Sequence, residues 1–183
     1  NIGTSSPVGD TLPVLLALNA SIDLRSKDAQ RLVPYDQFCT GYRKTILAAD
    51  ELIVAVHIPI PPVGAKQEWR KVGPRRAQSI SKVAIAAYAE INSDNVIEVF
   101  RVGLGAVAER PIRGNAIEAV LIGRTIEASS LEKLAEEVRA AVRNEISPID
   151  DVRSTADYRL EITENLIVRF IRQWSERGLT SSG

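Results

Sequence analysis

The chain has 183 residues, 45% of them hydrophobic and 25% charged, which are ordinary values for a globular domain. Acidic and basic residues number 23 each, so the chain lacks the basic excess that nucleic-acid binding requires. The longest apolar run, Val83–Ala89, is far shorter than the ~18 residues of a membrane span. The single cysteine, Cys39, excludes an intrachain disulfide and cannot alone hold an iron–sulfur cluster.

The way the sequence begins favours a segment of a longer protein. Residue 1 is asparagine, and the chain contains no methionine and no signal-like leader before Pro7. A processed mature N-terminus is the alternative. One unpaired cysteine fits a reducing compartment, so we expect a cytoplasmic protein.

The first third of the sequence predicts short elements of both kinds. Apolar runs and turn residues place them in the following order. They are a helix at Leu12–Leu18 opened by Pro13, strands at Ser21–Leu24 and Gln30–Pro34, a helical turn at Tyr35–Phe38 and a largely buried strand at Glu51–Ile58.

A linker follows the last of these strands. Pro61, Pro62 and Gly64 form the clearest break in the sequence, so we divide the chain into domains of residues 1–62 and 63–183. The second domain opens with three strand-like stretches, and Asn92–Asn95 predicts a hairpin between the last two. The three stretches are Gln67–Val72, Val83–Ile91 and Val96–Leu104.

Helical patterns fill the rest of the second domain. One ends before Gly123, a second begins after Ser130, and a third begins near Ser154 or Asp157. Strands followed by helices predict an α+β fold. We expect a small antiparallel three-stranded sheet with helices on one face, preceded by the end of another domain.

Few residues suggest catalysis by side chains. The one histidine, His57, lies in an apolar strand without a second His or Cys nearby in sequence, so a satisfied or surface-facing strand histidine is favoured over a metal ligand or general base. Gly103 and Gly105 follow a strand, but the residues after them are apolar, which favours close packing over phosphate binding.

The opening Asn1-Ile-Gly-Thr-Ser-Ser-Pro-Val-Gly-Asp10 is the best candidate for a ligand site. Its short polar side chains and glycines suit the polar tail of a nucleotide cofactor, and an ordinary capped loop is an equal alternative. Two basic clusters, Arg43-Lys44 and Lys71 with Arg75-Arg76, can meet a phosphate, although solvated surface charge is the usual explanation.

Several motifs together resemble one family. They are the opening decapeptide, Gly41-Tyr-Arg-Lys-Thr45, Asp50-Glu-Leu-Ile53, Lys71-Val-Gly-Pro-Arg-Arg-Ala-Gln-Ser-Ile-Ser-Lys82, Ala108-Glu-Arg-Pro111, Ile149-Asp-Asp-Val-Arg153 and Tyr158-Arg159 with Asn165-Leu166. In this order, over essentially the whole chain, they resemble the C-terminal part of the FAD-binding subunit or domain of xanthine dehydrogenase-type molybdenum hydroxylases. The later motifs are similar to the C-terminal domain of carbon monoxide dehydrogenase flavoproteins.

The resemblance assigns roles to individual positions. FAD would contact Asn1, Thr4, Ser6, Asp10, Ile53 and Lys71. Tyr42 would lie where NAD approaches the flavin, and residues 72–82 would form the segment beside the flavin ring. Dehydrogenases of the family often carry an acidic residue in that segment, where this chain has Gln78, and this leaves the electron acceptor open.

The resemblance also implies a reaction and partners. Electrons from a purine would pass from molybdopterin through iron–sulfur clusters, both on partner domains or subunits, to FAD and then NAD. The pyrophosphate loop of the family lies upstream of Asn1, so we expect this segment alone to bind FAD weakly. Alternatives are the FAD subunit of a sibling aldehyde, N-heterocycle or carbon monoxide dehydrogenase, and a non-catalytic docking module.

Overall fold

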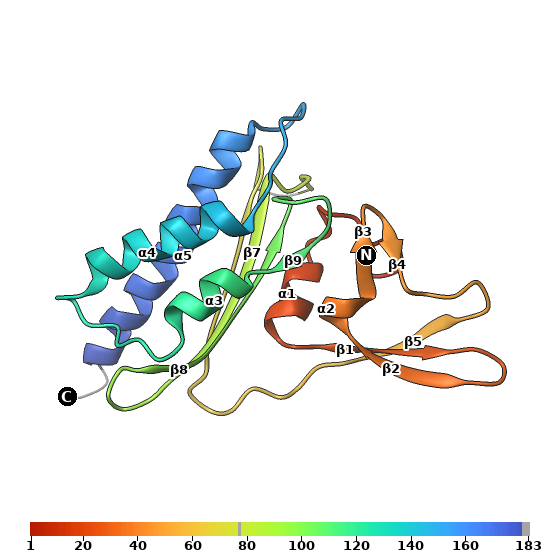
Figure 1. Ribbon diagram of the computed structural model, residues 1–183, viewed down its shortest axis with the longest axis horizontal. Coiled ribbons are helices and arrows are strands. Elements are labelled where there is room, and N and C mark those ends of the chain that lie inside the picture. The colour runs from red at the N-terminus through yellow and green to blue at the C-terminus, as the bar shows by residue number, and fades with distance from the viewer. Residues whose placement is uncertain (77, 181–183) are drawn as a thin grey trace.

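The computed structural model of the protein describes residues 1–76 and 78–180. Within them the chain forms small antiparallel sheets and five helices, which confirms the predicted α+β class (Figure 1). The elements are α1 (Leu12–Ala17), β1 (Ser21–Arg25), β2 (Gln30–Pro34), α2 (Tyr35–Phe38), β3 (Cys39–Gly41), β4 (Lys44–Thr45), β5 (Leu52–His57), β6 (Lys66–Val72), β7 (Val83–Ile91), β8 (Ile97–Gly105), β9 (Ile112–Arg113), α3 (Asn115–Leu121), α4 (Leu131–Glu145) and α5 (Ala156–Thr180).

The first sheet has three antiparallel strands in the order β2-β1-β5. Ile22 and Leu24 of the central strand are fully buried in a core shared with α1 and α2. The prediction that the strand around residues 51–58 is largely buried was wrong. It forms an edge of the sheet, and Leu52 and Val54 are 72% and 50% exposed on the face that points away from this core. The sequence did not predict the short hairpin of β3 and β4.

The second sheet has the order β6-β7-β8-β9. The hairpin predicted at Asn92–Asn95 is confirmed: β7 and β8 pair along nearly their whole length, and Asn95 adopts the left-handed conformation with φ of 58°. The sheet has one strand more than predicted. The extra strand, β9, has only two residues and pairs with Gly103 and Leu104 at the end of β8.

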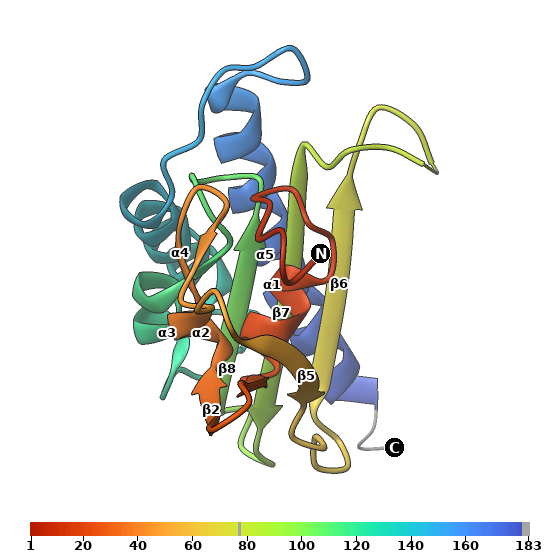
Figure 2. The ribbon, with the colours of Figure 1, turned by 90° about the vertical axis from the view of Figure 1, so that its right-hand side faces the viewer.

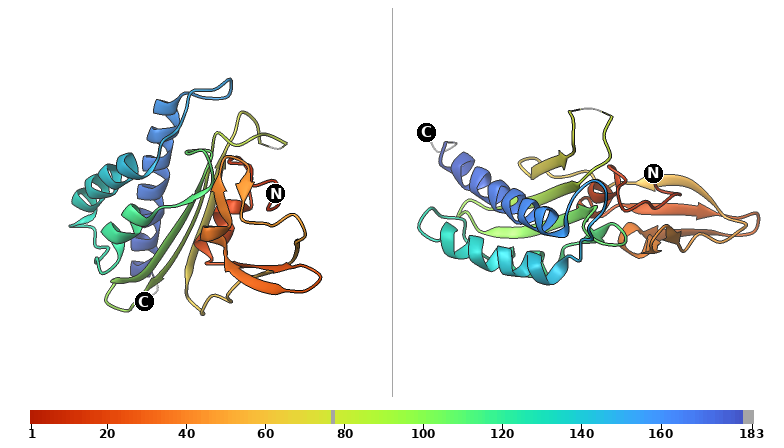
Figure 3. Two further views of the ribbon diagram at one scale, coloured as in Figure 1. Left: turned by 45° about the vertical axis from the view of Figure 1, so that its right-hand side comes forward. Right: turned by 90° about the horizontal axis from the view of Figure 1, so that it is seen from above.

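Helices cover both faces of this second sheet. Figures 1 and 3 show α3, α4 and α5 together on one face, as predicted for the second domain, and α1 from the first third of the chain against the other. The main core lies under α3 to α5, and the Trp174 ring meets those of Phe100 and Phe170 at centroid distances of 6.0 and 6.4 Å. Each of these aromatic side chains buries a large apolar area and so contributes strongly to the stability of this core.

The contact between α1 and the second sheet is unusually close because Gly103 has no side chain. A Cβ atom at Gly103 would lie 2.0 Å from the carbonyl oxygen of Pro13. Ala17 on α1 also packs with Ala86 and Tyr88 of β7. The expectation that Gly103 serves close packing is therefore confirmed, and the packing holds the start of the chain against the second sheet.

The helices of the second domain begin and end close to the predicted residues, but the capping hydrogen bonds differ from those predicted. Gly123 follows α3 with φ of 80°, as a glycine after a helix does. Ser130 precedes α4, but its hydroxyl donates to nearby carbonyls instead of capping the helix. The last helix begins after Thr155, whose hydroxyl oxygen accepts from the amide of Tyr158, and not at Ser154 or Asp157. Among the described residues, no helix is long and apolar enough to cross a membrane.

Candidate functional site

Residues 1–10, called the cofactor loop below because their sequence predicts contacts to a cofactor, form a tight series of turns before α1. The amide of Ser5 donates to the carbonyl of Asn1 at 3.0 Å, and the hydroxyl of Thr4 donates to the same oxygen at 3.2 Å. The loop packs closely on itself, because a Cβ atom at Gly9 would lie 2.9 Å from Oδ1 of Asn1. Asn1 and Thr4 are exposed and Ser6 is partly buried, so these side chains are available to a ligand.

Ser5 attaches the cofactor loop to the first core. It is fully buried, with a positive φ of 43°, and its hydroxyl donates to Sγ of Cys39 at 2.8 Å. The thiol of Cys39 in turn donates to the hydroxyl of Tyr35 at 3.4 Å. Burial, reinforced by this contact with Cys39, raises the pKa of Tyr35 far above its ordinary value. The phenol therefore stays neutral and serves the structure.

Asp10, at the end of the cofactor loop, contacts the second sheet through both carboxylate oxygens. Nζ of Lys71, on β6, donates to Oδ2 at 2.6 Å, and the hydroxyl of Ser81 donates to Oδ1 at 2.6 Å. The Asp10 side chain remains 41% exposed and that of Lys71 21% exposed. A carboxylate oxygen has two acceptor positions, so Asp10 can still accept a hydrogen bond from a ligand hydroxyl.

Two further predicted site residues differ in their position relative to the cofactor loop: one lies beside it, and the other has no described hydrogen bond or ring contact with it. Ile53, on β5, lies beside the cofactor loop, since its Cδ1 is 3.9 Å from where a Cβ atom of Gly3 would stand. Tyr42 lies in the turn between β3 and β4, is 59% exposed, and has the Arg43 guanidinium 5.9 Å from its ring centroid. Across residues 1–76 and 78–180, no hydrogen bond or ring contact joins its side chain to the cofactor loop.

A basic cavity of about 550 Å³ adjoins the pair of Asp10 and Lys71. It is lined by Trp69, Lys71, Val72, Gly73, Arg75, Arg76 and Ser79. Lys71 therefore belongs to both the cavity and the contact with the cofactor loop. The partly exposed indole of Trp69 offers a flat apolar surface beside these cations, a combination that suits an anionic ligand with a planar ring.

The segment that follows β6, described at residues 73–76 and 78–82, projects beyond the end of the sheet (Figure 2). Gly73 permits its compact shape, because a Cβ atom there would lie 2.3 Å from Oγ of Ser79. The carbonyl of Gln78, which has φ of 51°, accepts two hydrogen bonds from the Arg75 guanidinium. The position at which the resemblance expects an acidic residue is thus part of a turn closed by an arginine.

Side chains that suit metal binding do not gather anywhere in the described part of the chain, counting groups of three or more His, Cys, Asp and Glu. His57 lies exposed at the end of β5, so it is a surface-facing strand histidine.

Two known protein families match successive parts of this sequence. Residues 1–61 match the family described as the FAD binding domain in molybdopterin dehydrogenase. Residues 68–174 match the CO dehydrogenase flavoprotein C-terminal domain, over more than half of the chain. The chain belongs to the molybdenum hydroxylase flavoprotein family. The resemblance inferred from the motifs is confirmed by these two matches.

Individual members of this family are moderately similar in sequence. The xanthine dehydrogenase FAD-binding subunit of Escherichia coli O157:H7 is 27% identical over 94% of this chain and 58% of the relative. The glyceraldehyde dehydrogenase medium chain of Sulfolobus acidocaldarius is 28% identical over 94% of this chain and 59% of the relative. The carbon monoxide dehydrogenase medium chain of Afipia carboxidovorans is 26% identical over 97% of this chain and 59% of the relative. The chain thus spans somewhat under three fifths of the length of these relatives.

Solved structures share the fold. The carbon monoxide dehydrogenase of Hydrogenophaga pseudoflava superposes with a TM-score of 0.83 at 24% identity, over 92% of this chain and 56% of that one. Quinoline 2-oxidoreductase from Pseudomonas putida 86 gives a TM-score of 0.80 at 24% identity, over 97% and 59%. At these identities the likeness establishes the fold of this family member and not its substrate.

The structure adds one residue that sequence reasoning missed. Ser81 contacts Asp10 from 71 positions further along the chain. It lies within the motif that starts at Lys71, yet nothing in the local pattern distinguishes it from Ser79, whose hydroxyl donates to the carbonyl of Arg75 instead. Only the way β7 begins beside the cofactor loop selects Ser81.

Proposed function

We propose that this chain is part of the FAD-binding subunit of a xanthine dehydrogenase-type molybdenum hydroxylase. The observation that carries the proposal is the meeting of Asp10 and Lys71 beside the basic cavity. The family resemblance assigns each of these two residues to FAD. They lie in contact although one is in the region that matches the first family and the other in the region that matches the second. The polar cofactor loop on one side and the cations on the other fit the hydroxyls and phosphates of a dinucleotide.

Each assigned residue would have a limited role in holding the cofactor. Asn1, Thr4 and Ser6 would bond to polar atoms of FAD, and Asp10 would accept from a ribose or ribityl hydroxyl. Lys71 would hold the Asp10 carboxylate through their 2.6 Å contact and contribute positive charge, and Ile53 would pack against the flavin end and exclude water. FAD, when bound, would supply the electron-transfer chemistry, so no side chain acts as nucleophile or general base.

In this proposal the chain works within a larger enzyme. Electrons would come from molybdopterin and iron–sulfur clusters on partner domains or subunits and pass from FAD to NAD, with Tyr42 on the approach of NAD. Residues 1–62 would complete an FAD-binding domain with an upstream half, and residues 63–183 would form the flavoprotein C-terminal domain. A cytoplasmic location and a role in purine catabolism belong to the same proposal.

The test uses the full-length protein that contains this chain. We expect purified protein to show flavin absorption, and NADH to bleach it. Binding of FAD to the apoprotein would quench Trp69, which lines the cavity, and the variant Trp69→Phe should remove that part of the fluorescence change. Protein without flavin, and without affinity for added FAD, would refute the proposal.

Two alternatives predict different results in the same experiment. The FAD subunit of a sibling enzyme oxidising aldehydes, N-heterocycles or carbon monoxide would bind FAD but need not react with NADH. The turn at Gln78, without an acidic side chain, favours this alternative for the electron acceptor. A docking module would bind partner subunits and no flavin, and the exposed polar groups of the cofactor loop argue against it.

A further inference from the structure

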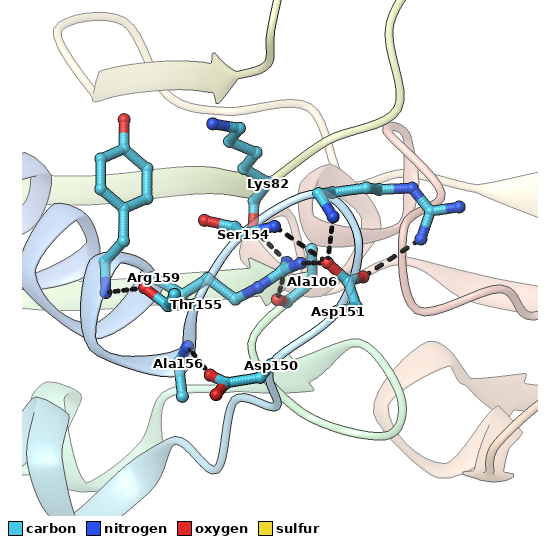
Figure 4. Close-up of polar contacts among 10 residues, drawn as sticks. Lys82, Ala106, Asp150, Asp151, Ser154, Thr155, Ala156 and Arg159 are labelled. Atoms are coloured by element: carbon cyan, nitrogen blue, oxygen red, sulfur yellow. Dashed lines mark hydrogen bonds and ion pairs between the residues drawn. The ribbon is translucent and has the colours of Figure 1, made fainter.

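The late motifs Ile149–Arg153 and Tyr158-Arg159 have no role in the site proposed so far. In the structure Asp151 and Arg153 of the first motif join Arg159 of the second in one hydrogen-bonded cluster, and Arg159 is 2% exposed (Figure 4). Its Nη2 donates to Oδ1 of Asp151 at 2.7 Å. The same carboxylate oxygen accepts the amides of Arg153 at 2.8 Å and Ser154 at 3.0 Å. Asp151 therefore holds one end of the guanidinium group in place.

The other end of the guanidinium lies where β7 and β8 separate. Nη1 of Arg159 donates to the carbonyls of both Lys82 and Ala106. Lys82 immediately precedes β7, and Ala106 immediately follows β8 with a positive φ of 66°. Arg159 thus satisfies two carbonyls that have left the strand ladder and holds the two strand ends together.

These two strand ends carry contacts to the cofactor loop. The amide of Ala106 donates to the carbonyl of Pro7 at 2.8 Å. Ser81, next to Lys82 and fully buried, donates to Asp10 at 2.6 Å. Each residue in this series is joined to the next by a hydrogen bond or is its neighbour in the sequence. Arg159 itself contacts no residue of the cofactor loop among its described hydrogen bonds.

We propose that Ser81 and Arg159 are positioning residues of the cofactor site. Ser81 orients the Asp10 carboxylate so that its free acceptor positions face the cofactor, and Arg159 fixes the strand ends from which Ser81 and Ala106 reach the loop. The inference rests on the proposed binding of FAD at Asp10. It assigns a role to the Asp151–Arg159 cluster that global stability alone does not describe.

The experiment compares full-length variants by FAD affinity, from flavin fluorescence, and by thermal unfolding. Loss of a hydrogen bond to a charged acceptor predicts that Ser81→Ala raises the Kd for FAD about 10-fold. Ser175→Ala is the matched control, because Ser175 is 5% exposed and donates to the carbonyl of Ile126 at 2.9 Å, remote from the loop. It should lower thermal stability similarly and leave the Kd unchanged.

A double-mutant cycle distinguishes positioning from a structural role. If Ser81 acts through Asp10, Ser81→Ala should change the Kd by less than about 2-fold in an Asp10→Ala background, where the acceptor of its hydrogen bond is gone. Equal effects of Ser81→Ala in both backgrounds, or an effect no greater than that of Ser175→Ala, would overturn the proposal for Ser81.

Hydrogen exchange without flavin tests the same inference independently of FAD. Arg159→Lys, which keeps the charge but loses the planar fork, should speed exchange of the Ala106 amide and of the cofactor-loop amides. Unchanged exchange at Ala106 would contradict the role of Arg159. If Arg159→Lys fails to fold, Ser81→Ala carries the exchange test, with faster exchange in the cofactor loop expected. Failure of the wild-type protein to bind FAD would refute the proposed function, whereas the exchange data would still decide whether these residues position the loop.

Discussion

Gly103→Ala tests how closely the start of the chain depends on the second sheet. The added Cβ atom would lie 2.0 Å from the carbonyl oxygen of Pro13 and 2.7 Å from its carbonyl carbon, both backbone atoms that cannot rotate away. Real contacts are rarely shorter than 3.0 Å, so α1 must move by about 1 Å. Overpacking of this kind costs about 1–3 kcal/mol. For a chain of this size the melting temperature would fall by about 2–12 °C.

Gly41→Ala provides the control, since Gly41 is a buried strand residue whose added Cβ would come no closer than 3.7 Å to any atom. The reduced entropy of the unfolded chain makes that change neutral or stabilising by about 0.4–1 kcal/mol. Calorimetric melting of both variants is the assay. Because Asp10 lies just before α1, Gly103→Ala should also weaken FAD binding. A Gly103→Ala protein that melts no lower than Gly41→Ala would refute the close packing described above.

Three further predictions follow from other contacts. The hydrogen bond from Arg31 lowers the pKa of Glu51 to about 2, so Arg31→Gln should return it toward 4.5 in an NMR titration, and the pair should stabilise the fold above pH 4.5 and cease to do so as the pH falls through 2. Burial alone would raise the pKa of Asp151, but backbone amides and Arg159 lower it overall. Asp151→Asn should therefore reduce the free energy of unfolding by about 1–3 kcal/mol at neutral pH, and by progressively less as acid protonates the wild-type carboxylate; a loss independent of pH would contradict this. Phe100→Ala should cost about 3–5 kcal/mol in denaturant unfolding, whereas Trp174→Phe should cost much less, because the indole Nε1 has no hydrogen-bond partner within the described residues; equal losses would be the wrong outcome.

Local sequence signals predicted much of the fold. The β7–β8 hairpin was predicted because its apolar strands and its Asn92–Asn95 turn are adjacent in sequence. The exposure of β5 was not, since an apolar run reads alike at an edge and at the centre of a sheet. The start of α5 was misplaced by one residue or two, because Ser154, Thr155 and Asp157 all carry capping groups and only the backbone geometry selects among them.

In the candidate site, too, the contacts that the sequence did not predict join residues that are far apart in the chain. Asp10 and Lys71 were proposed through a family resemblance, and their contact across 61 positions is visible only in the folded chain. Ser81 has no sequence signature, since its role depends on where β7 begins relative to the cofactor loop. Ile53 reaches the loop because a bulge between Asp23 and Leu24 sets the register of β1 and β5. A single sequence carries no record of such register shifts.

The position of α1 has a consequence for exchanging parts between related flavoproteins. The two sequence families meet at the linker between β5 and β6, which invites recombination there. Yet Ala17 and Pro13 of α1 fill the face of β7 and β8 that Ala86 and Gly103 present. A chimera joined at the linker would therefore place α1 of one parent against the closely packed sheet face of the other. Productive hybrids should retain α1 and the second sheet from the same parent, whatever parent supplies the strands between them.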